Sequence, residues 1–376
     1  MTYLDHAAST PVHEAALEAM LSAMREGASN PSSVHAAGRK ARAALDQARI
    51  EVSSYLGCLH AELRWEASGS AALGRALRSA LSLCSGPLVS SRLEHPAVRN
   101  VVEEAESSGR EVRWLSQPGG SLTPTVAAPL LEGAAVVALS AMNQELGTAP
   151  DLAPLLALAP SAWWVVDAVQ AAAWRDLRPL LAPRVFLACA SQKLGGPPGV
   201  AVLRVPRELA FAPAGRREPR FPEAPGTPPW IAAIGMGAAC RVRAPALREG
   251  LPRARAQAER LLAGLQRSCP DLVHNTGPDW VGPILDVSVP GVEARRMETA
   301  LDLRGLCVAR TSACQQARVV ASPVVAAAFP GAPWRADSAL RFSLALQTSE
   351  EDLDAALEAW SSALSELRPA TSTGST

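Results

Sequence analysis

The stretch VFLACASQKLGGPPGVAVLRV, residues 185–205, places one lysine between two apolar strand patterns and decides the fold class. Residues 185–190 are an apolar run typical of a buried strand, and residues 200–205 form a second one. The glycines and prolines between them predict a turn. Lys193 therefore follows the end of a strand, where α/β proteins place their chemistry.

Lysine is rare in this chain, which makes its presence here informative. Lys40 is the only other lysine, and 34 of the 36 lysine and arginine residues are arginine. Arginine stays protonated in proteins, whereas a lysine amine can lose its proton and form a Schiff base with a carbonyl compound. Lys193 is thus a candidate for covalent chemistry, and the alternative is an ordinary solvated lysine.

The overall composition is that of a globular protein with no obvious polymeric partner. The 376 residues are 48% hydrophobic and carry a formal net charge of zero. This length predicts one large and one smaller domain, and the neutral charge gives no support for nucleic acid or an anionic membrane as a partner. No apolar run reaches the roughly 18 residues of a membrane span, and residues 1–10 lack a signal-peptide pattern. We expect a cytoplasmic protein.

The seven cysteines and six histidines show no metal-binding or disulfide pattern. There is no C-x-x-C pair and no H-E-x-x-H motif. Neither a metal site nor a disulfide framework is therefore indicated.

Short apolar runs alternate with helical patterns over residues 1–245. This alternation predicts an α/β fold whose large domain has a mostly parallel sheet covered by helices, with residues 1–30 free to pack against the small domain. Two helices are predicted first, at 13–26 and 34–56. The predicted strands are 63–67, 88–91, 112–115, 135–140, 164–167, 185–191 and 200–205.

A smaller α+β domain is predicted at residues 246–367, after a Pro-rich loop at 212–229. The residues beyond it, 368–376, are polar and predicted to be disordered. The predicted helices are 230–242, 246–267, 294–303, 323–329 and 350–367, and the predicted strands are 284–289, 307–310 and 340–346.

An aspartate ends another apolar strand, WWVVDAVQ, 26 residues before Lys193. A buried acid is costly unless it has a cationic partner. The protonated ring nitrogen of pyridoxal phosphate would be such a partner, and the pairing would keep the ring able to accept electrons. Asp167 and Lys193 together favour a pyridoxal phosphate enzyme, while a helix-capping role is the alternative for Asp167 alone.

At this point the chain resembles the cysteine desulfurases, pyridoxal phosphate enzymes of the class V aminotransferase group with the aspartate aminotransferase-like fold. The resemblance runs from YLDHAASTP, which begins at Tyr3, to RFSLALQT, which ends at Thr348. Between them lie NPSSVHAAGRKA from position 30, EH at 94–95, NQELG from 143, DAVQ from 167 and SQKLGGPPG from 191. These motifs keep the family's order and spacing.

The resemblance implies a role for each matching residue. Lys193 would be the Schiff-base lysine, Asp167 the partner of the ring nitrogen, and Arg341 the group that holds the substrate carboxylate. His95 would stack on the ring and Gln170 would lie near the ring hydroxyl. In a homodimer, Thr227 would contact the phosphate bound in the neighbouring subunit, and Asn30 would lie on the substrate side. The remaining implied residues of the cofactor site are Ser70, Ala71, Gln144 and Gln192. The alternatives are a helix cap for His95, a surface side chain for Arg341 and a plain turn residue for Thr227.

Several residues on the phosphate side depart from the family pattern. Ala71 stands where the family has a threonine that contacts the phosphate, Ala190 replaces a serine, and Gln192 replaces a histidine. Gln144 likewise replaces an asparagine. Helix amides at Ser70 and Ala71 and the Gln192 side chain remain as donors. Each lost side-chain donor to an anion is expected to cost about 1.5–3 kcal/mol.

Two cysteines compete for the role of nucleophile. Cys307 lies in the strand pattern LCVAR and is interpreted as a core residue. Cys314 lies in the polar stretch ARTSACQQARVVAS and occupies the place of the family's active-site cysteine, in the subgroup with a long loop. A thiol that receives sulfur and then presents it to an acceptor needs such a loop. We therefore assign Cys314.

The implied activity is conversion of L-cysteine to L-alanine with a persulfide left on Cys314. Two alternatives stay open: another pyridoxal phosphate enzyme of the group, such as a selenocysteine lyase, C–S lyase or aminotransferase, and a degenerate paralogue that only binds a sulfur acceptor. The acceptor stays open too, whether an iron–sulfur scaffold, a tRNA or cofactor thiolation protein, or a DNA-modification system.

Overall fold

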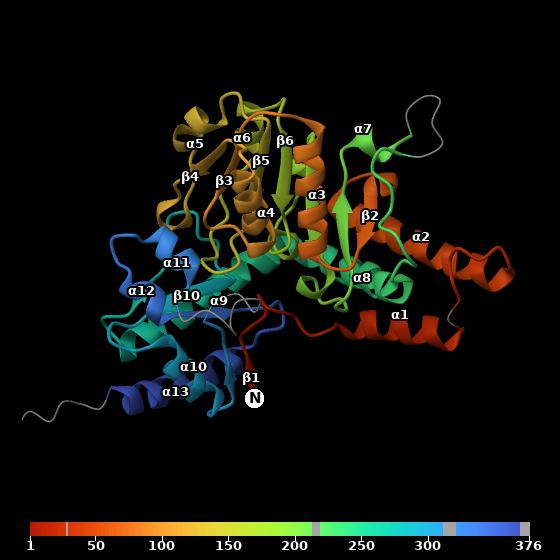
Figure 1. Cartoon of the computed structure of the whole chain (residues 1–376). Coiled ribbons are helices and arrows are strands. Elements are labelled where there is room, and N and C mark those ends of the chain that lie inside the picture. The colour runs from red at the N-terminus through yellow and green to blue at the C-terminus, as the bar shows by residue number, and fades with distance from the viewer. Residues whose placement is uncertain (28, 213–218, 311–320, 369–376) are drawn as a thin grey trace, which may run out of the picture.

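The computed structural model describes residues 1–27, 29–212, 219–310 and 321–368, and Figure 1 shows their arrangement. A large sheet with its helices occupies the upper part of the figure, and a smaller α+β unit lies below it. The seven strands of the large sheet have the order β2-β8-β7-β6-β5-β3-β4. Their bounds are β2 Leu63–Glu66, β3 Leu88–Ser91, β4 Val112–Leu115, β5 Val136–Ser140, β6 Trp163–Asp167, β7 Val185–Ala190 and β8 Ala201–Arg204.

All seven predicted strands of the large sheet are present, within one or two residues of their predicted bounds. Strands β4, β3, β5, β6 and β7 run parallel, while β8 is antiparallel to both of its neighbours. The predicted mostly parallel sheet is confirmed. Apart from Ser140 and Asp167 at the carboxyl ends of β5 and β6, strands β5, β6 and β7 are apolar, because both faces of a parallel sheet are covered.

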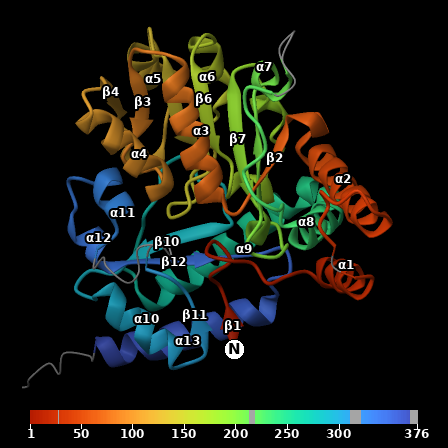
Figure 2. The same cartoon turned by 45° about the vertical axis from the view of Figure 1, so that its right-hand side comes forward.

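Two hydrophobic cores lie on the two faces of this sheet. Val137 and Leu139 of β5 point into one core, whereas Val136 and Ala138 of the same strand point into the other. Helices α3 (Gly69–Leu83) and α4 (Pro96–Ser107) cover the second face, in front of the strands in Figure 2, and α2 (Ala36–Leu56) and α8 (Trp230–Arg243) contribute to the first. The other helices of this part are α1 Glu14–Arg25, α5 Pro124–Leu131, α6 Ala153–Leu158 and α7 Arg207–Ala210.

The smaller unit is built on a three-stranded sheet of order β12-β10-β9. A third hydrophobic core joins it to the helices that follow the large sheet. The elements are α9 Leu247–Ser268, β9 Val273–His274, β10 Ile284–Ser288, α10 Ala294–Asp302, β11 Leu306–Cys307, α11 Pro323–Ala328, α12 Trp334–Ser338, β12 Ala339–Ser343 and α13 Glu350–Leu367. Helix α12, strand β9 and the two-residue strand Thr2–Tyr3 were not predicted, because all three are short and lack a clear apolar period.

The first residues of the chain lie against this smaller unit. Strand β1 (Thr2–Tyr3) pairs in parallel with β11, which is only two residues long where four were predicted. The predicted boundary at residue 245 falls in the turn Ala244–Ala246 between α8 and α9. The division into two domains remains a prediction. Arg368, at the start of the predicted disordered tail, donates a hydrogen bond to Asp271, and the other tail residues lie outside the described ones.

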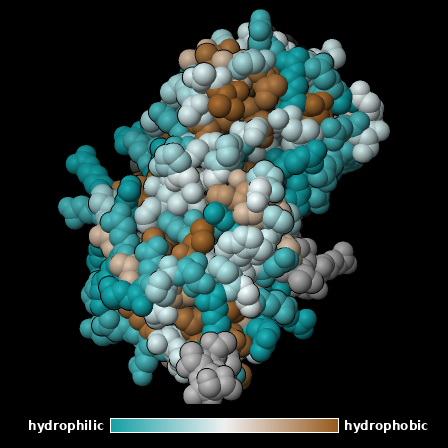
Figure 3. All heavy atoms as spheres, turned by 90° about the vertical axis from the view of Figure 1, so that its left-hand side faces the viewer, coloured by the Kyte–Doolittle hydropathy of each residue, from teal (hydrophilic) through white to brown (hydrophobic). Residues whose placement is uncertain are grey.

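No helix in the described part of the chain is long and apolar enough to cross a membrane. On the face shown in Figure 3 the surface is largely hydrophilic, with apolar patches separated by hydrophilic residues. This face therefore offers no continuous apolar belt.

A buried acid on β10 makes stability depend on pH. Asp286 is fully buried and accepts a hydrogen bond of 2.7 Å from Asn275, while its second oxygen has no partner. Burial, reinforced by nearby Glu145, raises the pKa of Asp286 well above its usual value of 3.8. The folded protein then keeps a proton that the unfolded chain has lost, so stability falls as the pH rises above about 4.

We expect Asp286→Asn to be more stable than the parent at pH 8 by about 1–3 kcal/mol, the cost of a poorly satisfied buried group. The difference should vanish near pH 4, and thermal unfolding measured at both pH values tests this. Asp271→Asn is the opposite control, because its hydrogen bond with Arg368 lowers the pKa of Asp271 to about 2 and stabilises the fold at neutral pH. A gain for Asp286→Asn that is the same at both pH values would contradict the assignment.

Candidate active site

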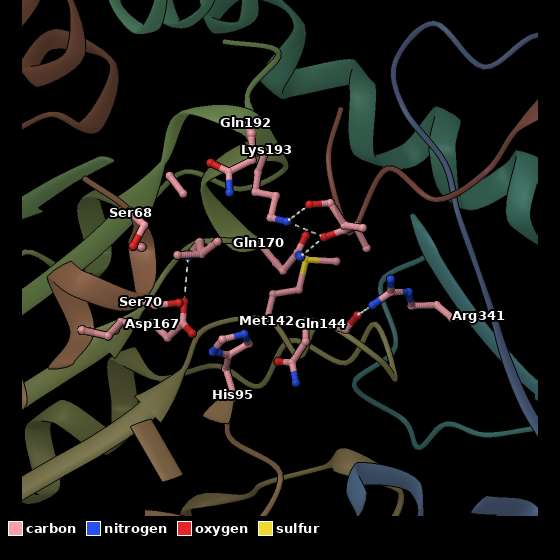
Figure 4. Close-up of a pocket in the computed structure, with 16 residues that line it drawn as sticks. Ser68, Ser70, His95, Met142, Gln144, Asp167, Gln170, Gln192, Lys193 and Arg341 are labelled. Carbon is pink, nitrogen blue, oxygen red and sulfur yellow. Dashed lines mark hydrogen bonds between the residues drawn. The ribbon is translucent and has the colours of Figure 1, made fainter. Parts of the chain in front are cut away.

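A cavity lies at the carboxyl edge of the large sheet, next to the smaller unit (Figure 4). Eight residues that the sequence assigned to a site line it together: Ser70, His95, Gln144, Asp167, Gln170, Gln192, Lys193 and Arg341. The remaining lining residues are Ala7, Ala8, Ser68, Gly69, Leu73, Met142, Val169 and Ala190.

The sheet topology explains this convergence. Asp167 is the last residue of β6, Lys193 follows β7, and His95 follows β3. Because these strands are parallel, their carboxyl ends meet at one edge, where α/β folds bind ligands. Arg341 reaches the same cavity from β12 of the smaller unit.

The Lys193 side chain extends into the cavity and meets the N-terminal segment. Its Nζ donates to the carbonyl oxygen of Ala7 at 2.6 Å and also to that of Ala8. Gln170 donates from Nε2 to the same Ala7 oxygen at 2.8 Å. Figure 4 shows the lysine and these carbonyl groups on one side of the cavity, opposite His95.

Asp167 is a buried acid on the cavity wall. One carboxylate oxygen of Asp167 accepts the amide hydrogen of Val169 at 2.9 Å. Burial raises the pKa of Asp167 to about 6, against the opposing effects of the Val169 hydrogen bond and of Lys193. A cationic ring nitrogen beside this carboxylate would satisfy it.

His95 has the capping role that the sequence left as an alternative and also lines the cavity, while its stacking on a cofactor ring remains a prediction. Its Nδ1 accepts the amide hydrogen of Ala97 at 3.1 Å and so caps α4, and the ring also lines the cavity. Burial, together with the positive charges of Lys193 and Arg99, lowers the pKa of His95 to about 4. The imidazole is therefore neutral at pH 7 and suited to packing against an aromatic ring.

Arg341 is a buried cation with donors left over. Its Nη1 donates to the backbone oxygen of Gln144 and its Nη2 to the carboxylate of Asp5, each at 2.8 Å. The Arg341 Nε and the Gln144 side-chain Nε2 are buried without a partner. The surface-arginine alternative is wrong, because Arg341 is only 1% exposed. These donors can bind a carboxylate.

The helix start at the other end of the cavity can bind an anion. Ser68 caps α3 by accepting the amide hydrogen of Ala71 at 3.1 Å, so that amide is already engaged, and Ala71 does not line the cavity. The amides of Gly69 and Ser70 remain as first-turn donors. A side chain at position 69 would lie 2.8 Å from Val169, so only glycine permits this close approach.

Besides Ala71, two further predicted site residues do not reach the cavity of their own chain. Asn30 lies between α1 and α2 and accepts the amide hydrogen of Ser32 at 2.9 Å. Thr227 lines a separate hollow, together with Trp65 and Gly199. A site role for either residue thus requires a second subunit and remains a prediction.

Cys314 lies outside the described residues, but both ends of its segment are described. Ala309 exchanges two backbone hydrogen bonds with Arg341, of 3.1 and 2.6 Å. At the other end, Ser322 donates from its hydroxyl to Glu145 at 2.6 Å. The described residues before the segment thus lie beside Arg341, and those after it lie beside Glu145, the residue that follows Gln144.

Sequence reasoning did not identify Ala7, Ala8, Leu73 and Met142 as lining residues. The alanines lie in the motif YLDHAASTP, so the resemblance contained a signal for them. Leu73 and Met142 are buried apolar residues, and their patterns do not distinguish a cavity wall from a core.

Comparison with known proteins yields a family and close structural matches. The model of the family "Aminotransferase class-V" matches residues 2–356. The chain is 30% identical to the "IscS-like cysteine desulfurase" of Mycobacterium tuberculosis, over 98% of both chains. It is 28% identical to a "Cysteine desulfurase" of Enterobacter agglomerans, over 97% of this chain and 93% of that protein.

Solved structures show the same fold. A "NifS-like protein" superimposes with a TM-score of 0.86 at 22% identity, and the match covers 97% of this chain and 100% of the other. A structure titled "SspA in complex with cysteine" gives a TM-score of 0.74 at 22% identity, covering 93% and 100%. The predicted α/β fold class, with a large mostly parallel sheet and a smaller C-terminal α+β part, is confirmed.

Proposed function

The chain belongs to the class V aminotransferase family and within it to the cysteine desulfurases, and on this premise we propose the reaction of its site. L-cysteine and the Cys314 thiol react to give L-alanine and a Cys314 persulfide. The carbon–sulfur bond of the substrate breaks, and a sulfur–sulfur bond forms at Cys314. One observation carries the proposal: Lys193, Asp167, His95 and Arg341 converge on one cavity.

The donor set of the cavity fits pyridoxal phosphate. Lys193 offers an amine for its aldehyde, Asp167 a carboxylate for its ring nitrogen, and Gly69 and Ser70 amides for its phosphate. His95 would pack against the ring, and Gln170 would lie near the ring hydroxyl. The cofactor would supply an electron sink for the charge that develops on the substrate α-carbon.

The protein's own residues then orient the substrate and move its proton. Arg341 binds the substrate carboxylate and so fixes the α-carbon, because its guanidinium is held by the Gln144 carbonyl and Asp5. The unpartnered Gln144 amide adds a second donor. Lys193 Nζ acts as the general base that takes the α-proton and holds it for return.

Cys314 performs the sulfur transfer. Its segment is tethered at Ala309, which pairs with Arg341, and four residues of chain beyond Arg310 span at most about 14 Å. Ala309, the described residue that pairs with Arg341, lies five residues before Cys314 in the sequence. The Cys314 thiolate attacks the substrate sulfur, and the alanine formed takes up the proton.

The activity is tested by supplying purified protein with pyridoxal phosphate and L-cysteine. We expect alanine and protein-bound persulfide in equal amounts in a single turnover. Alanine formed without persulfide would favour a lyase, and preferential turnover of selenocysteine would favour that substrate. A protein that forms neither product would be the non-catalytic paralogue.

We propose that the protein is a homodimer. Leu17, Leu21 and Met24 of α1 are 40%, 40% and 53% exposed, and their spacing places them on one face of the helix. Val34 and Ile50 add exposed apolar surface nearby in the chain. The predicted roles of Asn30 and Thr227 require a second copy of the chain against this surface.

A cytoplasmic location remains our expectation, supported by six described cysteines that form no disulfide.

We expect Thr227→Ala to weaken retention of pyridoxal phosphate by about 10-fold, the loss of one hydrogen bond to a charged group. A hydroxyl supplied by the neighbouring subunit also links cofactor binding to dimerisation, so dilution should release cofactor. Equilibrium dialysis at several subunit concentrations measures both effects. Thr125→Ala, an exposed threonine of α5, is the control. Unchanged affinity, with no concentration dependence, would remove Thr227 from the site.

A further inference from the structure

The N-terminal segment presents two backbone carbonyl groups to the Lys193 side chain. Nζ donates to the Ala7 and Ala8 oxygens, and Gln170 donates to the Ala7 oxygen as well. Carbonyl oxygens only accept hydrogen bonds, whereas an ammonium group has three donors. A pair of carbonyl groups therefore stabilises the charged form of the lysine in preference to the neutral amine.

The two carbonyl groups are held rigidly by the smaller unit. The Ser343 hydroxyl accepts the amide hydrogen of Ala7 at 2.8 Å and donates to the Leu4 oxygen at 3.2 Å. Ser343 also pairs with Leu4 through its own amide at 2.7 Å. On the other side, the amide of Thr10 donates to the Gln192 oxygen at 2.8 Å, which ties the segment to the large sheet next to Lys193.

We propose that the carbonyl groups of Ala7 and Ala8 form a holding site for the protonated Lys193 side chain, occupied in the cofactor-free protein and again, during turnover, once Nζ has taken the substrate proton. The proposal rests on the proposed function, in which Lys193 is the cofactor lysine. Ser343 is then a positioning residue, because it acts on Lys193 only through the Ala7 amide. The site delays cofactor uptake and, during turnover, holds the proton taken from the substrate.

The charged and titratable groups that face Lys193 do not replace the carbonyl groups. Asp167 attracts the ammonium group from across the cavity, whereas the guanidinium groups of Arg341 and Arg243 repel it. Burial lowers the pKa values of His95 and His6 to about 4, so both rings are neutral at pH 7. The two carbonyl groups are neutral acceptors in direct contact with Nζ.

The two lysines of the chain make a direct test possible. In cofactor-free protein labelled with ¹⁵N-lysine, the two labelled Nζ groups are those of Lys193 and Lys40, and Lys40→Arg shows which NMR signal belongs to Lys193. We expect a protonated Lys193 signal that exchanges slowly with water at pH 7.5, and a Lys40 signal lost to fast exchange, because Lys40 is 67% exposed. A neutral amine at Lys193, or exchange as fast as that of Lys40, would overturn the proposal.

A variant separates the holding site from the rest of the cavity. Ser343→Ala should take up pyridoxal phosphate about tenfold faster than the parent, since one weakened hydrogen bond to a charged group corresponds to that factor and only the neutral amine reacts. Ser343→Thr should restore the slow rate. Ser288→Ala, an equally buried serine on the neighbouring strand, should leave the rate unchanged.

Uptake by Ser343→Ala at the parental rate would contradict the proposal. If that variant does not fold, the NMR experiment on the parent still decides. A protein that takes up no pyridoxal phosphate at all would instead refute the proposed function, and the Lys193 ammonium signal would remain measurable.

Discussion

Lys193→Ala is expected to lose all turnover of L-cysteine together with the visible absorbance of a covalently bound cofactor. The variant lacks the amine that joins the cofactor and takes the α-proton. No other residue can replace it. Lys40 lies on α2 and pairs with Glu26 at 2.7 Å on the surface, and the arginines stay protonated.

Absorbance spectra and alanine production, measured side by side, check this result. Lys40→Arg is the matched control and should retain both colour and activity. Lys193→Arg should behave like the alanine variant, since arginine supplies the charge without the reactive amine. Appreciable alanine from either Lys193 variant would refute the assignment of the cofactor lysine.

Cys314→Ser is expected to keep the coloured cofactor but to form no persulfide. The loss should be complete, because a hydroxyl cannot accept the sulfur. Four of the described cysteines are poor substitutes for Cys314 as the nucleophile. Burial raises the pKa of Cys58 to about 12 and that of Cys269 to about 11, and it raises those of Cys189 and Cys240 further. Thiolates, the reactive form, are thus disfavoured at these positions.

Cys307→Ser is the informative control for the nucleophile. Cys307 lies on β11 opposite Tyr3, and burial together with Asp302 and Asp5 raises its pKa. We expect this variant to form persulfide as the parent does. Mass spectrometry after incubation with L-cysteine locates the extra sulfur, and a persulfide mapped to any residue other than Cys314 would overturn the choice.

The strands and most helices followed from local patterns because burial on both faces leaves a plain signal. β5 to β7 are apolar except for Ser140 and Asp167 at the carboxyl ends of β5 and β6, and their bounds were predicted within about two residues. The short elements α12 and β9 were missed because their five and two residues cannot show a period. Their conformation depends on packing against the rest of the smaller unit.

The positions of the chemical groups were predictable where the chain places them at strand ends. Asp167, His95 and Lys193 follow parallel strands, so their convergence follows from the α/β pattern alone. The position of Arg341 in the cavity could not be predicted from a local pattern. Arg341 lies on a different sheet and more than a hundred residues after Lys193 in the chain. The resemblance to a known family, rather than spacing, supplied that residue.

The sequence by itself determined the fold class, the family and the residues able to carry the chemistry, because these depend on residue type and local period. Only the tertiary structure decided that Asp5 and the Gln144 carbonyl hold Arg341, and that the Ala7 and Ala8 carbonyl groups receive Lys193. These contacts join backbone and side-chain groups from distant parts of the chain. Every residue has a backbone carbonyl group, so the sequence cannot show which carbonyl groups will face a buried amine. The packing of β1 against the smaller unit determines which ones do.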